Sequence, residues 1–126
     1  MAVRKVDHIC IVTRNLDKAV DFYTRLLGFS PGARERLDAG NIEIAVVTLG
    51  ETNIEFVRHD TPPDCQGRDG AIELIGILVD DLPAEIDRLR REGVEFLMPE
   101  PLKIGDTGQL IFFRGPSGEK LELLSR

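Results

Sequence analysis

Two glutamates and one histidine are the residues of this sequence whose types and settings could do chemistry. Glu55 lies in the run Ile54-Glu55-Phe56 and Glu122 in Leu121-Glu122-Leu123, so each carboxylate is flanked by apolar residues. His8 lies in an apolar run near the start of the sequence. A carboxylate that faces a protein interior is costly unless it is paired or bound to a metal ion. The three side chains are therefore candidates for a functional site.

The elements that must position these residues occur twice. The apolar run from Val6 to Val12 has a counterpart from Ile72 to Leu78, and a pattern typical of an amphipathic helix follows each run. A short polar residue is placed to cap each helix and a glycine to end it. These residues are Asn15 with Gly28 in the first copy, and Asp81 with Gly93 in the second.

Three strands are predicted after each helix. They are 29–34, 42–49 and 53–58 in the first half, and 94–98, 109–114 and 120–124 in the second. The sequence therefore predicts an α+β fold of two tandem βαβββ modules, with the helices outside and the sheets forming a curved, half-open barrel cleft. We expect a single domain over 1–126, with module one at about 4–59, a connector at 60–70 and module two at about 71–126.

The composition excludes several classes of function. A chain of 126 residues that is 42% hydrophobic can bury one core, and its net charge of −6 argues against a nucleic-acid binder or an anionic membrane surface. The apolar runs are well short of the roughly 20 residues that span a bilayer. Cys10 and Cys65 lack metal-binding spacing, and no secretory signal is visible. We expect a cytoplasmic protein.

Strand alternation sorts the polar residues by face. His8 shares a face with Cys10, and the repeat places Leu74 where His8 stands in the first half. Glu73 has the opposite parity, so we expect it to be solvated or salt-bridged. Cys10 is expected to be a small buried side chain. Strand register, which the sequence leaves open, decides whether Phe112 or Phe113 lines the cleft.

Several motifs together resemble the vicinal oxygen chelate superfamily. The run from Val6 through Asn15-Leu16 to Leu27-Gly28-Phe29 is similar to its opening module, Val79-Asp80-Asp81-Leu82 to its second-module turn, and Gly118 to Leu123 to its closing motif. The superfamily includes glyoxalase I, methylmalonyl-CoA epimerase, extradiol dioxygenases, fosfomycin-resistance transferases and metal-free drug-binding proteins. The resemblance implies a divalent metal held from the positions of His8, Glu55, Leu74 and Glu122. Leu74 departs from that pattern.

A lyase, isomerase or epimerase of glyoxalase type is the leading interpretation of this resemblance. His8, Glu55 and Glu122 would ligate Mn, Co, Ni, Fe, Zn or Mg, and the sequence does not choose among these ions. Proton transfer beside a metal-bound carbonyl through an enediolate-like intermediate would be the shared step, with Glu55 or Glu122 as the catalytic base. The resemblance implies a small-molecule substrate and a homodimer.

Other interpretations remain open at this point. Leu74 favours a metal-free protein of the same fold that binds a drug or metabolite, with His8 paired to a carboxylate. A dioxygenase or fosfomycin-type transferase is disfavoured, because those branches use two histidines and this chain has a single inward one. The Pro99–Gly108 segment is either a plain surface connection or a loop that covers the cleft.

Overall fold

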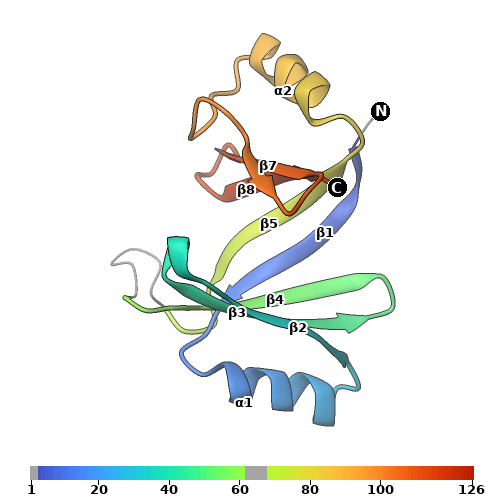
Figure 1. The fold of residues 1–126 in the computed structure, drawn as a ribbon, viewed down its shortest axis with the longest axis vertical. Helices are drawn as coiled ribbons and strands as arrows, with labels where there is room; N and C mark the ends of the chain where they lie inside the picture. The colour runs from blue at the N-terminus through green and yellow to red at the C-terminus, as the bar shows by residue number, and fades with distance from the viewer. Residues whose placement is uncertain (1–2, 62–67) are drawn as a thin grey trace. The chain divides into compact units, whose positions relative to one another are not determined.

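The computed structural model describes residues 3–61 and 68–126, and in these ranges it contains two α-helices and eight strands (Figure 1). Cys65 and most of the predicted connector lie outside the described residues. The first half consists of β1 (Val3–Val12), α1 (Leu16–Asp21), η1 (Phe22–Leu26), β2 (Ser30–Leu37), η2 (Asp38–Gly40), β3 (Ile42–Leu49) and β4 (Thr52–His59). The second half consists of β5 (Ile72–Val79), α2 (Leu82–Arg91), β6 (Leu102–Ile104), β7 (Gly108–Arg114) and β8 (Lys120–Ser125).

The strands of the first half are ordered β2-β3-β4-β1. β1 pairs in parallel with β4, and the other pairings are antiparallel. α1 begins where predicted, because the Asn15 side chain accepts a hydrogen bond from the Lys18 amide. The π-helical turn η1 extends α1, and Gly28 follows with a φ of 79°. The buried Leu16 of α1 packs against Val47 and Phe56, so α1 covers one face of this half of the sheet.

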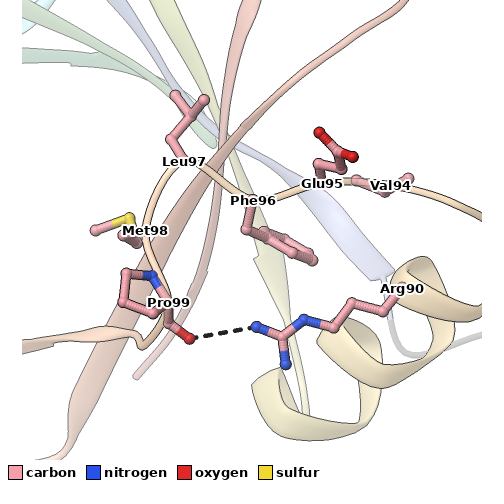
Figure 2. A pocket seen from close by; sticks show the side chains of 7 residues that line it. All are labelled: Arg90, Val94, Glu95, Phe96, Leu97, Met98 and Pro99. Carbon is pink, nitrogen blue, oxygen red and sulfur yellow. Dashed lines mark hydrogen bonds between the residues drawn. The ribbon is translucent and has the colours of Figure 1, made fainter.

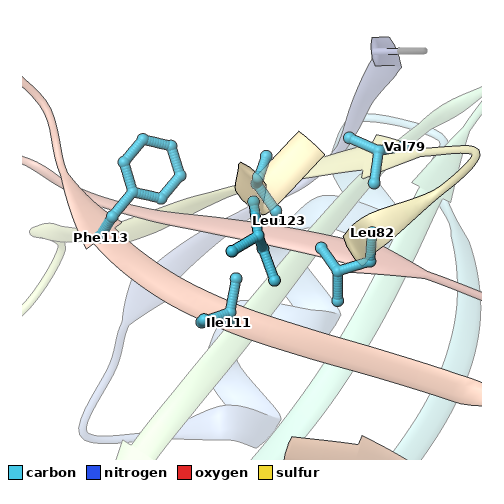
Figure 3. Packing of buried hydrophobic residues seen from close by; sticks show 6 residues of the cluster. Val79, Leu82, Ile111, Phe113 and Leu123 are labelled. Atoms are coloured by element: carbon cyan, nitrogen blue, oxygen red, sulfur yellow. The ribbon is translucent and has the colours of Figure 1, made fainter. Parts of the chain in front are cut away.

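The second half repeats this plan with the order β5-β8-β7-β6. β5 pairs in parallel with β8, as β1 does with β4. Asp81 caps α2 by accepting from the Ala84 amide, and Gly93 follows α2 with a φ of 92°. The buried residues between α2 and the strands interdigitate in one cluster (Figure 3). Its members are Val79, Leu82, Ile86, Ile111, Phe113 and Leu123.

The two compact units of the structure divide within strands, not at the connector. One unit, called here the first unit, is His8–Glu73, and the second unit joins the residues up to Asp7 with Leu74–Arg126. The boundaries therefore fall inside β1 and β5, since each of these strands contributes its start to one unit and its remainder to the other.

The predicted α+β class with two tandem βαβββ modules is confirmed. One strand is displaced from its predicted position. The segment 94–98 makes only an isolated bridge, between Phe96 and Phe113, and the regular strand is β6, inside the segment predicted to be a loop. The apolar residues Val94, Phe96 and Met98 produce the strand-like pattern because they pack on the core cluster beneath α2.

Candidate functional site

His8 and Glu55 are brought together by the parallel pairing of β1 and β4. His8 lies opposite Asn53 and Cys10 opposite Glu55. The Nε2 atom of His8 is 3.9 Å from Oε2 of Glu55. The side chains are 11% and 24% exposed, so this is a largely buried acid–base pair with limited access to solvent. Two of the three predicted site residues therefore meet in the first unit.

This pair lies on the face of the sheet opposite α1. Phe56 and Ile54 of β4 pack with α1, and side chains alternate along a strand. Glu55 therefore projects to the other face, together with His59 four residues further on. On β1 the same alternation puts His8 and Cys10 on one face. The first unit thus has an apolar face beneath its helix and a face that carries titratable groups.

A second titratable cluster lies within the first unit. The carboxylate of Glu73 pairs through Oε1 with Nε2 of His59, and its Oε2 accepts from the Cys10 thiol at 3.8 Å. The side chains of His59 and Glu73 are 18% and 10% exposed. Glu73 is thus salt-bridged, as one of the two expectations had it, and Cys10 is buried. Sequence reasoning gave His59 no role, because its partner is distant along the chain.

Glu122 occupies the equivalent position of the second unit. It is buried, and it lies opposite Gly76 of β5 and Phe112 of β7. Its neighbours Leu123 and Phe113 pack beneath α2, so Glu122 and Phe112 lie on the opposite face of that sheet. Of the two phenylalanines, Phe113 therefore lies beneath α2 and Phe112 on the face away from the helix. The ammonium group of Lys120 is 4.3 Å from the Phe112 ring centroid.

A divalent ion needs several oxygen, nitrogen or sulfur donors close together. No group of three or more His, Cys, Asp or Glu side chains arranged to hold a metal occurs within 3–61 and 68–126. His8 and Glu55 belong to the first unit and Glu122 to the second, so the three-ligand set remains a prediction. An imidazole with two carboxylates is a donor set that suits borderline and hard divalent cations. Leu74, which is buried, contributes no donor at the fourth position.

A cavity of about 460 Å³ lies elsewhere in the second unit, between α2 and the segment that follows it (Figure 2). Arg90 of α2 points across it, donates from Nη2 to the Pro99 carbonyl at 3.3 Å, and lies 5.5 Å from the Phe96 ring centroid. The lining residues are Arg90, Val94, Glu95, Phe96, Leu97, Met98 and Pro99. None of the predicted site residues lines this cavity.

An exposed ion pair lies near the end of β4. Arg36 binds Asp60 through Nη1 at 2.9 Å and Nη2 at 2.5 Å. Hydrogen bonding to Arg36 lowers the pKa of Asp60, and the same bonds raise the pKa of Arg36. The pair links the residue after β4 to β2, outside the His8–Glu55 pair.

The repeated βαβββ modules and the His8–Glu55 pair on the sheet face opposite α1 define a class of small α+β proteins. The model of the Glyoxalase/Bleomycin resistance protein/Dioxygenase superfamily matches residues 5–123. The chain therefore belongs to this superfamily, as the sequence motifs implied.

Relatives with named activities are similar to the chain over most of its length. The mitochondrial methylmalonyl-CoA epimerase of Homo sapiens is 27% identical over 118 residues, which cover 89% of this chain and 66% of that protein. A probable lactoylglutathione lyase of Synechocystis sp. is 27% identical over 121 residues, covering 93% of this chain and 92% of the relative.

Among solved structures, methylmalonyl-CoA epimerase from Mycobacterium tuberculosis superposes with a TM-score of 0.86 at 23% identity. The superposition covers 98% of this chain and 89% of that chain, and it shows the shared fold. Neither α-helix in the part of the chain that the structure describes is long and apolar enough to traverse a membrane.

Proposed function

We propose that the protein is a divalent-metal-dependent lyase or epimerase of glyoxalase type, which moves a proton beside a carbonyl group of a small molecule. The observation that carries the proposal is the pairing of His8 with Glu55 on the inner face of the first unit. Membership of the superfamily supports it, as does the burial of Glu122 at the position equivalent to Glu55.

His8, Glu55 and Glu122 would hold the ion. A divalent cation at these donors would polarise the substrate carbonyl and stabilise the negative charge that develops as the proton leaves carbon. His8 would act as a neutral imidazole ligand through one ring nitrogen. The ion is one of Mn, Co, Ni, Fe, Zn or Mg.

The proton is taken by a carboxylate. In an epimerase, one of Glu55 and Glu122 would take the proton at Oε and the other would give a proton to the opposite face of the same carbon. In a lyase of glyoxalase type, one carboxylate would take the proton from one carbon and return it to the adjacent carbon. Each carboxylate lies in a largely dehydrated place, where a base is protected from competing water and its strength depends on its charged neighbours.

The substrate class follows from the relatives. The names of two relatives, methylmalonyl-CoA epimerase and a probable lactoylglutathione lyase, each contain the name of an acyl thioester. We therefore propose an acyl thioester or a related α-hydroxycarbonyl compound as the substrate.

Metal content tests the proposal first. Protein purified without chelator or nickel resin is expected to contain or take up about one divalent ion per chain, and His8→Ala is expected to lose it. Glu51→Gln, which changes an exposed carboxylate in the β3–β4 turn, is the control. Exchange of the substrate α-proton with deuterated water, followed by NMR, then tests catalysis with Glu55→Gln and Glu122→Gln. Absence of any uptake of Mn²⁺, Co²⁺, Ni²⁺ or Zn²⁺ contradicts the proposal.

A metal-free binding protein is the second candidate, and the buried Leu74 favours it. An apolar side chain at the fourth position adds contact area for a ligand and removes a donor. This alternative predicts tight binding of small molecules with no dependence on added metal, measured by calorimetry in the presence of chelator.

A homodimer is also proposed. The strands at the two ends of the sheet order, β2 and β6, are exposed along their whole lengths, and they carry exposed apolar residues that include Leu37 and Leu102. Uncovered edge strands are sites where a second chain can pair. Light scattering coupled to gel filtration is expected to give twice the chain mass of 14.0 kDa.

A further inference from the structure

Two acid–base pairs occupy equivalent places in the internal repeat. Asp7 immediately precedes His8, and Glu73 immediately precedes Leu74 at the matching position. At the other end of each module, His59 follows Glu55 by four residues and Arg126 follows Glu122 by four. The structure pairs Glu73 with His59 and Asp7 with Arg126. Each acid thus binds a basic residue of the other module: His59 is the last residue of β4, and Arg126 follows the last residue of β8.

These two pairs match the boundaries of the compact units. The first unit ends at Glu73, and the second unit takes in the chain up to Asp7. Asp7 is 4% exposed and binds Arg126 with both oxygens, at 2.5 and 3.1 Å. Each pair therefore fastens the start of a first strand within the unit to which that start belongs.

The Glu73 pair has a second arm. Glu73 contacts His59 on β4 through one oxygen and the Cys10 thiol on β1 through the other. Cys10 lies opposite Glu55 and two residues beyond His8, on the same face. One carboxylate therefore links the two strands that bring His8 and Glu55 to within 3.9 Å. These strands are parallel, a pairing that is slightly less stable per residue than the antiparallel one.

We infer that Glu73 is a positioning residue, which fixes the place of His8 relative to Glu55 by bracing β1 against β4. This inference rests on the proposed function, because it concerns how a predicted metal ligand is held. The sequence hid the role, since alternation put Glu73 on the wrong face for direct ligation. Glu73 would act through its contacts with Cys10 and His59, and not as a metal ligand in place of Leu74. Partners that orient a ligating histidine commonly change metal affinity by 10- to 100-fold when they are removed.

The test uses the fact that the chain has only two histidines. The protein is labelled in its histidine rings, and NMR spectra are recorded at one fixed pH without metal; His8→Gln identifies the His8 signals, because they are the signals that this variant lacks. Glu73→Gln is expected to shift the His8 ring signals, because it weakens the contacts of residue 73 with His59 and Cys10. Zn²⁺ titration of the same variant is expected to show an affinity lower on the order of tenfold. Glu51→Gln, an exposed carboxylate in the β3–β4 turn, is the matched control.

The outcomes separate this inference from the proposed function. His8 signals that stay in place in folded Glu73→Gln, as in Glu51→Gln, overturn the positioning role. If that variant does not fold, His59→Ala and Cys10→Ala each remove one of the two contacts of Glu73 and are judged by the same His8 signals. If the wild-type protein binds no Zn²⁺, a zinc-dependent activity is excluded. The spectra recorded without metal still decide whether Glu73 positions His8.

Discussion

The two βαβββ modules have the same plan but different chemistry at equivalent positions. In the first, His8 and Cys10 of β1 face Glu55 of β4. In the second, Leu74 and Gly76 of β5 stand at the same places beside Glu122 of β8. The helix-side cores are equally apolar in both modules. The repeat therefore preserves packing on one face of each sheet, while the other face has diverged.

The contacts of the equivalent acids Asp7 and Glu73 also differ. Asp7 is held by an arginine, which is always charged, whereas Glu73 is held by a histidine and a thiol. Four titratable groups thus lie on β1 and β4 of the first module: His8, Cys10, Glu55 and His59. In the proposed site the first module would therefore contribute His8 and Glu55, and the second module would contribute Glu122.

Truncation of a buried leucine in either core should give the largest loss of stability, and the two losses show whether the helix-side cores are equivalent. Leu16 and Leu82 each begin a helix at matching positions, and they are 3% and 1% exposed. Leu16→Ala and Leu82→Ala should each lower the free energy of unfolding by about 2–5 kcal/mol, because each leaves a cavity. Urea denaturation followed by circular dichroism measures this. A loss in one variant several times that in the other would show that the two cores are not equivalent.

A histidine in place of Leu74 would remove the difference between the modules at the position equivalent to His8. Leu74→His places an imidazole where the second module lacks one, and it should raise affinity for Zn²⁺ by on the order of tenfold, about 1.4 kcal/mol. Calorimetric titration measures the change, with Leu74→Gln as a control of similar polarity. An affinity unchanged by the histidine would count against a metal site at this position.

Helix capping gives a third, smaller comparison. Asn15 and Asp81 accept from the Lys18 and Ala84 amides at 3.0 and 3.1 Å. Asn15→Ala and Asp81→Ala should each cost about 1 kcal/mol of stability, since each leaves a helix N–H without its partner. Thermal unfolding checks both, and Asp17→Ala, an exposed residue of the first turn of α1, is the control. No loss in either cap variant would contradict the assignment.

The smallest effect concerns the exposed Arg36–Asp60 pair. Because Arg36 lowers the pKa of Asp60, the pair stabilises the fold above the ordinary pKa of an aspartate and loses this effect as the pH falls through the lowered value. The difference in stability between wild type and Asp60→Asn should be constant above about pH 5 and shrink below about pH 4. Denaturation across this range at low and high salt measures it, with Asp106→Asn as the control. A difference that grows on acidification would refute this sign.

The internal repeat, both helix caps and the glycines that end the helices could be read from the sequence, because each depends on neighbours a few residues away. Asn15, Asp81, Gly28 and Gly93 all do what their types predict. The superfamily was visible for the same reason, since its motifs are short runs such as Gly118 to Leu123. The repeat and strand alternation marked His8 and Glu55 as candidates, and the parallel pairing of β1 with β4 brought them together.

Tertiary structure alone decided the pairings between residues far apart in the chain. Glu73 meets His59 and Cys10, and Asp7 meets Arg126, only after β1 and β5 have taken their places. The register of β7 against β8 placed Phe112 with Glu122, and packing beneath α2 kept Phe96 out of a regular strand. Alternation along one strand says which way a side chain points, whereas the partner it reaches depends on which strands are neighbours.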